Sequence, residues 1–329
     1  MSDLELLKAC GGKPLASGGE TVWDFGFRPS DPALTAQVVE PFTDEDGVLV
    51  DGDKVFLWEY ARIANGGKLP PYSMQVTGSC VNSGGQNAAI TRIGVECVNL
   101  AAPEVFKVPF TLHAYGYSRH LYGWESPGEG SMGDGMARAL QEVGVTTIDD
   151  PSVPKASIYK NAFVYPENVE MQYSAWRNAP QAVRDAAKPH PFKYGSVGSL
   201  DEAEKELRRG RPLTWAGNWG GRMKGVYKGT GANRILWNGD RADTWNHQQS
   251  VHGMWKHPEF GRIWYVMNNW YSIQGGEAVP VHGAPANDEP PGGYWIGDAT
   301  MEYQIRTGEV RSLKDFSGFT KGLIRLGNV

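Results

Sequence analysis

The sequence has few cysteines, no long apolar run and no excess of positive charge. Its three cysteines, Cys10, Cys80 and Cys97, are an odd number in 329 residues, and they form no CxxC or Cys/His zinc spacing. This pattern excludes a disulfide framework and favours folding under reducing conditions. No stretch approaches the roughly 18 consecutive apolar residues that a membrane helix needs, so no membrane partner is predicted.

The charge balance is slightly acidic. Asp and Glu number 37 against 32 Lys and Arg, which gives a formal net charge of -5 and a pI near 5.8. Nucleic acid and anionic membrane surfaces are therefore not predicted partners. The N-terminus, Met1-Ser-Asp-Leu-Glu-Leu, is acidic and lacks the basic and long apolar regions of a signal peptide. We therefore expect synthesis and folding in a cytoplasm.

Glycine and proline are abundant, at 42 and 21 residues, as in soluble, loop-rich globular proteins. Residues 1–69 are expected to form an irregular N-terminal arm that contains a short capped helix from Asp3 to Cys10. Residues 55–64 suit a strand or a short helix equally well. The main domain is expected over residues 70–310, after a turn rich in Gly and Pro, and residues 311–329 are expected to be a C-terminal tail.

The expected domain has a helical half, residues 70–198, and a β half, residues 199–310. One predicted helix carries Cys80 and another covers Met136 to Val143. In the second half, a capped helix from Leu200 to Arg209 precedes the expected strands Pro212–Trp219, Gly225–Lys228, Ile235–Trp237, Ser250–Trp255, Arg262–Asn268 and Tyr294–Ile296. Helices first and strands second predict an α+β fold whose two halves pack face to face.

The tryptophan-rich second half and the glycine-rich loop each have two interpretations. Eight of the 12 Trp residues lie between Trp215 and Trp295, which indicates an aromatic β core rather than a wall on which sugars stack. The glycine-rich loop from Gly123 to Gly135 lacks a Gly-Lys-Ser/Thr ending. We therefore interpret it as a surface loop and not as a phosphate-binding loop.

Cys80 lies where a loop with Gly78 and Ser79 runs into a predicted helix. The N-terminus of a helix carries a partial positive charge and N–H groups without intrahelical acceptors, so it favours a thiolate over a thiol. The simpler interpretation is a small buried cysteine on an apolar helix face. A lone cysteine becomes a candidate nucleophile only if partners occur elsewhere in the chain.

Seven histidines could supply a base: His113, His120, His190, His247, His252, His257 and His282. The last four are close enough in sequence to suggest a metal site. However, three of them are spaced by five, and an odd spacing on a strand sends side chains to opposite faces. The nearest acidic residues, Asp243 and Glu259, fall in flanking turns, so neither a metal nor another cofactor is predicted.

Acyl transfer explains the pattern better. His247 begins one expected strand and Asn268 ends the next, with a turn from Pro258 to Gly261 between them. An antiparallel pair brings these ends together, so the amide oxygen of Asn268 accepts from one imidazole nitrogen of His247. The other nitrogen then faces the sulfur of Cys80, an arrangement that converts a thiol into an ion-paired nucleophile near neutral pH.

At these residues the sequence resembles the papain-like cysteine peptidases. The resemblance rests on a Gln-x-x-Gly-Ser-Cys run from Gln75 to Cys80, on His247 ahead of a strand and Gly253, on the triplet Asn268-Asn-Trp270, and on the later run Gly293-Tyr-Trp-Ile296. It covers about residues 70–310, with insertions. It implies a papain-like α+β fold in which the helical half, with the cysteine helix, packs against an antiparallel β half.

The resemblance also implies a role for each matched residue. Cys80 would be the nucleophile, His247 the base and later the acid, and Asn268 the residue that orients the histidine. Gln75, with the Cys80 backbone N–H, would form the oxyanion hole. Trp270 would shield the Asn–His hydrogen bond from water.

Four departures mark a remote branch of that family. Val81 replaces the aromatic residue that usually follows the cysteine, and Gln75 precedes the cysteine by five residues instead of six. Asn269 and Tyr271 replace the Ser and Gly that flank the tryptophan. The spacings from the cysteine to His247, and from His247 to the asparagine, are longer than in compact members, so the substrate pocket cannot be inherited from the family.

The predicted function is hydrolysis of peptide or amide bonds in a peptide or protein substrate, by a Cys-His-Asn mechanism with an acyl-enzyme intermediate. The run Tyr115-Gly-Tyr-Ser-Arg119 and the run Gly130-Ser-Met also resemble papain-like proteins of tailed bacteriophages. The alternative is therefore a virion structural component that keeps the fold with little or no required catalysis. Such a component would enter the phage particle and contact other virion proteins through the N-terminal arm.

Overall fold

The computed structural model describes residues 5, 8, 13–17, 20–24, 27–28, 49–99, 105–219, 221–239 and 245–319. The helix expected from Asp3 to Cys10 lies outside the described residues, apart from Glu5 and Lys8, which are helical. Within the described part, no helix combines the length and the apolar character needed to cross a membrane.

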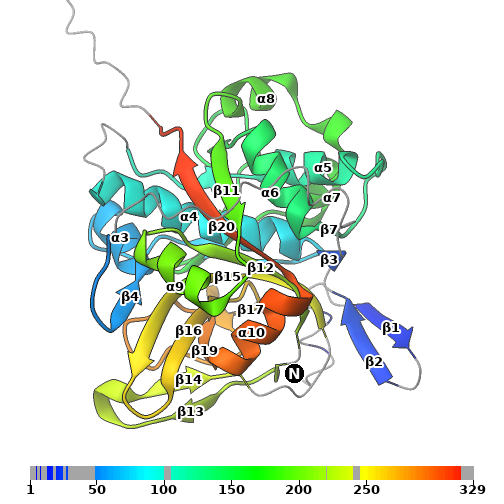
Figure 1. The fold of residues 1–329 in the computed structure, drawn as a ribbon. Helices are drawn as coiled ribbons and strands as arrows, with labels where there is room; N and C mark the ends of the chain where they lie inside the picture. Colours follow the sequence, from blue (N-terminus) through cyan, green and yellow to red (C-terminus); the bar gives the residue numbers. More distant parts are fainter. Residues whose placement is uncertain are drawn as a thin grey trace, which may run out of the picture.

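Helices gather in the first half of the chain, around one long central helix (Figure 1). That helix is α4, Cys80–Asn99, and it carries the candidate nucleophile at its first residue. The others in this half are α3 (Leu57–Ala64), α5 (Leu112–His120), α6 (Gly133–Glu142), α7 (Glu167–Tyr173), α8 (Gln181–Ala187) and the 3-10 turn η1 (Trp176–Asn178). Short strands lie between the helices: β5 (Tyr72–Ser73), β6 (Pro109–Phe110), β7 (Ser131–Met132), β8 (Thr146–Thr147), β9 (Ser157–Ile158) and β10 (Ala162–Val164). Of these, β5, β10 and β9 form a three-stranded sheet and β6 pairs with β8, whereas β7 pairs with a strand of the N-terminal arm.

The second half is built on an 11-stranded sheet whose main path runs β11-β20-β12-β15-β16-β19-β14-β13. The strands of this path are β11 (Phe192–Ser196), β12 (Leu213–Trp219), β13 (Val226–Lys228), β14 (Ile235–Trp237), β15 (Trp245–His257), β16 (Gly261–Met267), β19 (Gly293–Gly297) and β20 (Glu309–Phe316), and three strands from before residue 70 complete the sheet. Neighbours on this path are antiparallel except β14 and β19. Outside it lie the hairpin β17 (Tyr271–Gln274) and β18 (Glu277–Pro280), the 3-10 turn η2 (Gly231–Asn233), α9 (Leu200–Arg208) and α10 (Asp298–Thr307). The predicted α+β organisation is confirmed.

The hairpin of β15 and β16 sets the relative positions of His247 and Asn268. The turn between the strands ends at Gly261, whose φ of +71° is the left-handed conformation that glycine adopts without strain. The strands then pair antiparallel from His257 opposite Gly261 to Ser250 opposite Met267. Asn268 directly follows this last pair, and His247 precedes it by three residues on the partner strand.

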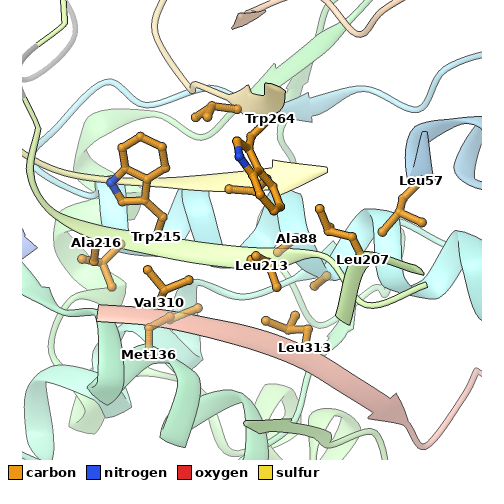
Figure 2. Close-up of a cluster of buried hydrophobic side chains, with 14 of the residues drawn as sticks. Leu57, Ala88, Met136, Leu207, Leu213, Trp215, Ala216, Trp264, Val310 and Leu313 are labelled. Carbon is orange, nitrogen blue, oxygen red and sulfur yellow. The ribbon is translucent and has the colours of Figure 1, made fainter. Parts of the chain in front are cut away.

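The core lies between α4 and the sheet (Figure 2). Ala88 of α4 and Met136 of α6 face Leu213, Trp215, Val310 and Leu313 of the sheet, and all six side chains are buried. Small side chains let α4 approach closely: a Cβ at Gly84 would lie 2.9 Å from the Gln248 side chain of β15. Trp215, Trp255, Trp264, Trp270 and Trp295 are all buried, which confirms the core interpretation for these tryptophans.

Two segments outside the expected domain of residues 70–310 join its core. Residues 55–64 form both predicted structures in succession, because β4 (Lys54–Phe56) pairs with β15 and then leads into α3, which packs on α4. At the other end, β20 runs across residue 310 and pairs with both β11 and β12. The sheet therefore extends into the segment expected to be a C-terminal tail.

The described strands of the N-terminal arm contact both halves of the molecule. The arm contains β1 (Lys13–Ser17), β2 (Glu20–Asp24) and β3 (Phe27–Arg28), and β1 and β2 form a hairpin. β2 runs parallel to the start of β15, with Asp24 opposite Asn246. β3 runs parallel to β7, with Phe27 opposite Ser131. The arm thus bridges the β half, beside His247, and the helical half.

Candidate active site

Cys80 occupies the first turn of α4. The first i to i−4 hydrogen bond of the helix runs from the Ser83 N–H to the Ser79 carbonyl, at 3.2 Å, so Cys80 follows the N-cap position. The Cys80 side chain is 0% exposed and belongs to the main hydrophobic core cluster. The predicted position at a helix N-terminus is therefore confirmed, in a closed environment.

His247 and Asn268 meet, as the strand pairing predicts. Nε2 of His247 lies 2.8 Å from Oδ1 of Asn268, and the same oxygen accepts the Asn269 backbone N–H at 2.8 Å. The Trp270 ring covers the imidazole, with centroids 4.6 Å apart and planes 30° from parallel. Because a backbone N–H can only donate, it identifies this atom as the amide oxygen, so the proton of the His247–Asn268 hydrogen bond belongs to His247 Nε2.

The segment after β16 is also bonded to the cysteine loop. The Gln75 backbone N–H donates to the Asn269 carbonyl at 3.0 Å, and Nδ2 of Asn269 lies 3.5 Å from the Cys80 carbonyl. These contacts join the start of α4 to the end of β16. The structure thus gathers the cysteine loop, the histidine strand and the Asn268-Asn-Trp270 triplet in one place, while their catalytic roles stay predictions.

The Gln75 side chain is engaged inside its own loop. Its Nε2 donates to the Thr77 carbonyl at 2.6 Å, and the residue is fully buried. One N–H of the Gln75 side-chain amide is therefore directed at the backbone of Thr77. The NH₂ group has a second donor hydrogen, and its expected place in the oxyanion hole stays a prediction.

Burial dominates the electrostatics of the centre. His247 is 1% exposed, and desolvation lowers its pKa to about 3, although the hydrogen bond to Asn268 opposes this shift. The nearby His282 lowers the pKa further. His247 is therefore a neutral imidazole with its proton on Nε2 and a lone pair on Nδ1, which is the form that can accept a proton from a thiol.

The other two histidines of β15 are structural. The ring nitrogens of His252 contact Thr91 Oγ1 and Ser250 Oγ, each at 2.6 Å. His257 lies at the far end of the strand, where Nε2 contacts the Asn233 carbonyl at 2.9 Å. Across the described ranges, no three His, Cys, Asp or Glu side chains gather as metal ligands.

Glu170 of α7 holds the cysteine loop, and nothing in the sequence singled it out. Its Oε2 accepts from Thr77 Oγ1 at 2.5 Å and from Ser79 Oγ at 2.9 Å. The residue is 2% exposed, and burial raises its pKa to about 7 against the opposing effect of these hydrogen bonds. The carboxyl group therefore fixes both residues that flank Gly78, next to Cys80.

This burial predicts a pH-dependent stability. Because the folded pKa of Glu170 is raised, its contribution is greatest below the unfolded value of 4.5 and is lost as pH rises through about 7. Relative to Glu170→Gln, which mimics the neutral group, the unfolding free energy of the wild type should fall by about 3 kcal/mol from pH 4.5 to 8. Urea titrations of both proteins across this range measure the difference.

The comparison between the two proteins isolates Glu170. The buried histidines, whose pKa values are lowered, weaken the fold as pH falls, but they are the same in both proteins and cancel. A difference that stayed constant with pH would contradict the prediction.

No protein-family model matches this sequence, and none of the curated proteins matches it by sequence. Solved structures do match. Xylellain, a cysteine protease from Xylella fastidiosa, is similar over 88% of this chain and 96% of its own, with 17% identity and a TM-score of 0.53. Procathepsin B S9 from Trypanosoma congolense covers 89% of this chain and 88% of its own, with 11% identity and a TM-score of 0.54.

A third solved structure matches at similarly low identity. Digestive procathepsin L 3 of the Tenebrio molitor larval midgut covers 94% of this chain and 78% of its own, with 13% identity and a TM-score of 0.53. At such identities the likeness is one of fold. The chain has the papain-like fold, which confirms the predicted fold class, and the likeness to phage-encoded members stays a prediction.

Proposed function

We propose that this protein is a thiol hydrolase that cleaves peptide or amide bonds through an acyl-enzyme on Cys80. The observation that carries the proposal is the 2.8 Å contact between His247 Nε2 and Asn268 Oδ1 under the Trp270 ring. This contact lies on a papain-like fold, and the neighbouring Asn269 reaches the carbonyl of Cys80, the first residue of the central helix, at 3.5 Å. The combination supports a base of defined tautomer next to a nucleophile at a helix N-terminus.

The proposed reaction has two stages. In the first, His247 Nδ1 takes the thiol proton while the Cys80 sulfur attacks the substrate carbonyl carbon, and the imidazolium then gives this proton to the leaving amine. In the second, His247 takes a proton from water, the hydroxide attacks the thioester, and the proton returns to the Cys80 sulfur as the acid leaves. Throughout, Asn268 would stabilise the imidazolium, and the positive end of α4 would stabilise the oxyanion.

The complete burial of Cys80 and His247 means that a substrate needs the centre to open. The N-terminal arm is the segment best placed to control this step. β2 pairs with β15 directly before His247, and β3 pairs with β7 on the helical half. Release of the arm would leave free backbone edges on both sides of the centre, where an extended peptide can add as a strand.

Alkylation of Cys80 tests the proposal. A specific protease site inserted within residues 29–48 allows the arm to be cut after the full chain has folded, and gel filtration then separates protein that has lost the arm fragment from protein in which strand pairing retains it. After the cut, iodoacetamide at about pH 6 should label Cys80 at least about tenfold faster than Cys97, because in the proposed mechanism His247 takes the Cys80 proton and the start of α4 favours the thiolate. Peptide mass spectrometry reads both sites in the same sample. His247→Ala should remove the preference, and labelling of Cys80 no faster than Cys97 in the cut protein would refute the enzyme proposal.

The second candidate function is a virion structural component that keeps the fold without required catalysis. The closed centre favours it, since a protein that admits no substrate can keep Cys80 and His247 fully buried. Its proposed partners are other virion proteins, contacted through the N-terminal arm. This candidate predicts that Cys80 stays unreactive after the cut and that the protein co-purifies with a particle at fixed stoichiometry.

A further inference from the structure

His282 lies against the side of Asn268 that does not face His247. It follows β18 in the chain, is 1% exposed, and its ring packs between Trp270, at 5.6 Å, and Tyr294, at 4.9 Å between centroids. Nε2 of His282 contacts Nδ2 of Asn268, and Nδ1 lies 2.6 Å from the Met223 carbonyl oxygen. The Asn268 amide is therefore held between two imidazoles, one at each end.

The Met223 carbonyl determines the tautomer of His282. A carbonyl oxygen can only accept, so a nitrogen 2.6 Å away must carry a proton, and the proton of the neutral ring is on Nδ1. Nδ1 is also 3.2 Å from Nδ2 of Asn238. The Asn238 side-chain amide is bonded to the N–H and the carbonyl of Arg222, at 2.8 Å each. The Nδ1 proton of His282 is therefore donated to the closer Met223 carbonyl. Nε2 of His282 is then an acceptor, which matches the N–H donor of Asn268.

We propose that His282 is a positioning residue that fixes the orientation of the Asn268 amide and, through it, the tautomer of His247. With Nδ2 donating to His282, Oδ1 is turned toward His247 and the Asn269 N–H. Oδ1 accepts the Nε2 proton of His247, so the lone pair of that ring is on Nδ1. A relay of four groups, from the Met223 carbonyl to His247, thus specifies which nitrogen is basic.

A rotated amide would be mismatched at both ends. It would present NH₂ to the Nε2–H of His247 and oxygen to the lone pair of His282, although its shape would be nearly unchanged. Packing therefore discriminates poorly between the two orientations, and hydrogen bonds must do so. Burial keeps the His282 ring neutral by lowering its pKa to about 4, although the backbone hydrogen bonds to Met223 and Arg222 oppose the shift. The ring therefore remains an acceptor near neutral pH.

Nitrogen NMR of the full chain with ¹⁵N-labelled histidine tests the relay without reference to activity. Signals that disappear in His282→Leu identify this residue. Between pH 6 and 8 they should report a neutral ring protonated on Nδ1, and removal of His282 should shift the His247 signals. A His282 ring protonated on Nε2, or on both nitrogens, would overturn the inference.

The effect of His282 on catalysis is measured by steady-state kinetics. This part of the inference rests on the proposed function. With the arm cut, His282→Leu should lower kcat by about 10- to 100-fold, the range found for groups that orient metal-bound histidines, and leave KM within about twofold. Glutamine can donate to Met223 and accept from Asn268, so His282→Gln should recover most of the loss. His257→Leu, which removes another buried histidine remote from the centre, is the matched control and should keep kcat.

A double-mutant cycle separates positioning from general damage to the fold. If His282 acts only through Asn268, then His282→Leu should cost no further kcat in an Asn268→Ala background. Equal losses for Leu and Gln, or full additivity with Asn268→Ala, would overturn the inference. If Cys80→Ala hydrolysed substrate as fast as the wild type, the proposed function would fail, and the NMR tautomer would still decide the role of His282.

Discussion

Cys80→Ala should lower the hydrolysis of peptides by at least about 10⁴-fold, because no acyl-enzyme can form without the sulfur. The measurement is kcat/KM on a fluorogenic peptide mixture, with the arm cut after folding so that the closed centre does not mask the difference. His247→Ala should be similarly damaging, since the thiol then lacks the base that takes its proton. Asn268→Ala should lose less, because Asn268 acts on the histidine and not on the substrate.

The chain offers a matched control for this result. Cys97 lies on the same helix, α4, and is half-buried, so Cys97→Ala removes an equivalent thiol from the same element. It should leave kcat/KM unchanged within about twofold. Hydrolysis by Cys80→Ala at the wild-type rate would assign the activity to a different centre, and an inactive wild-type protein would favour the structural candidate.

The contact between His247 and Asn268 could be predicted from the sequence because it depends on local pairing. One turn, at Pro258 to Gly261, joins the two strands, and counting outward from it places the two residues near each other. The position of Cys80 at a helix start was equally local, since Gly78 and Ser79 mark the end of a loop. A thiol, an imidazole and an amide brought together in this way are typical of acyl transfer, which is why the sequence predicted a thiol hydrolase.

His282 and Glu170 could not be found in this way. Both reach the centre through long-range packing, Glu170 from α7 and His282 from the segment after the β17–β18 hairpin. Neither lies in a motif, and a sequence shows no sign that a side chain will be buried with specific partners. His282 was noticed only as one of four histidines close in sequence, which were considered as metal ligands, and no metal was predicted.

The sequence did not indicate that residues before 70 and after 310 join the core, for two physical reasons. Residues 55–64 contain the end of a strand followed at once by a helix, so their periodicity mixes two patterns and does not decide between them. β20 contains Arg311, whose charge suggests an exposed segment, yet its side chain is 7% exposed and pairs with Asp134 at 2.6 Å. A buried strand with a paired charge cannot be distinguished from a polar tail by composition.

Gly94→Ala should destabilise the protein by about 3 kcal/mol or more, although a Gly to Ala change inside a helix ordinarily stabilises by roughly 0.5–1 kcal/mol. A Cβ at Gly94 would lie 2.4 Å from the Cα of Ala61 and 2.8 Å from its Cβ. These are fixed atoms of α3, so the two helices must move apart. α3 continues from β4, which pairs with β15, and the strain therefore reaches the sheet that carries His247.

Gly85→Ala is the control for Gly94→Ala, because it changes the same residue type on the same helix against a flexible neighbour. Its Cβ would meet the Met136 side chain at 3.0 Å, and a methionine side chain can rotate away. Its cost should stay within about 1 kcal/mol, since helix propensity and mild crowding oppose each other. Urea unfolding monitored by tryptophan fluorescence measures both variants. A Gly94→Ala protein as stable as the wild type would show that α3 does not pack against α4 through this contact, and that the segment before residue 70 is separable from the core.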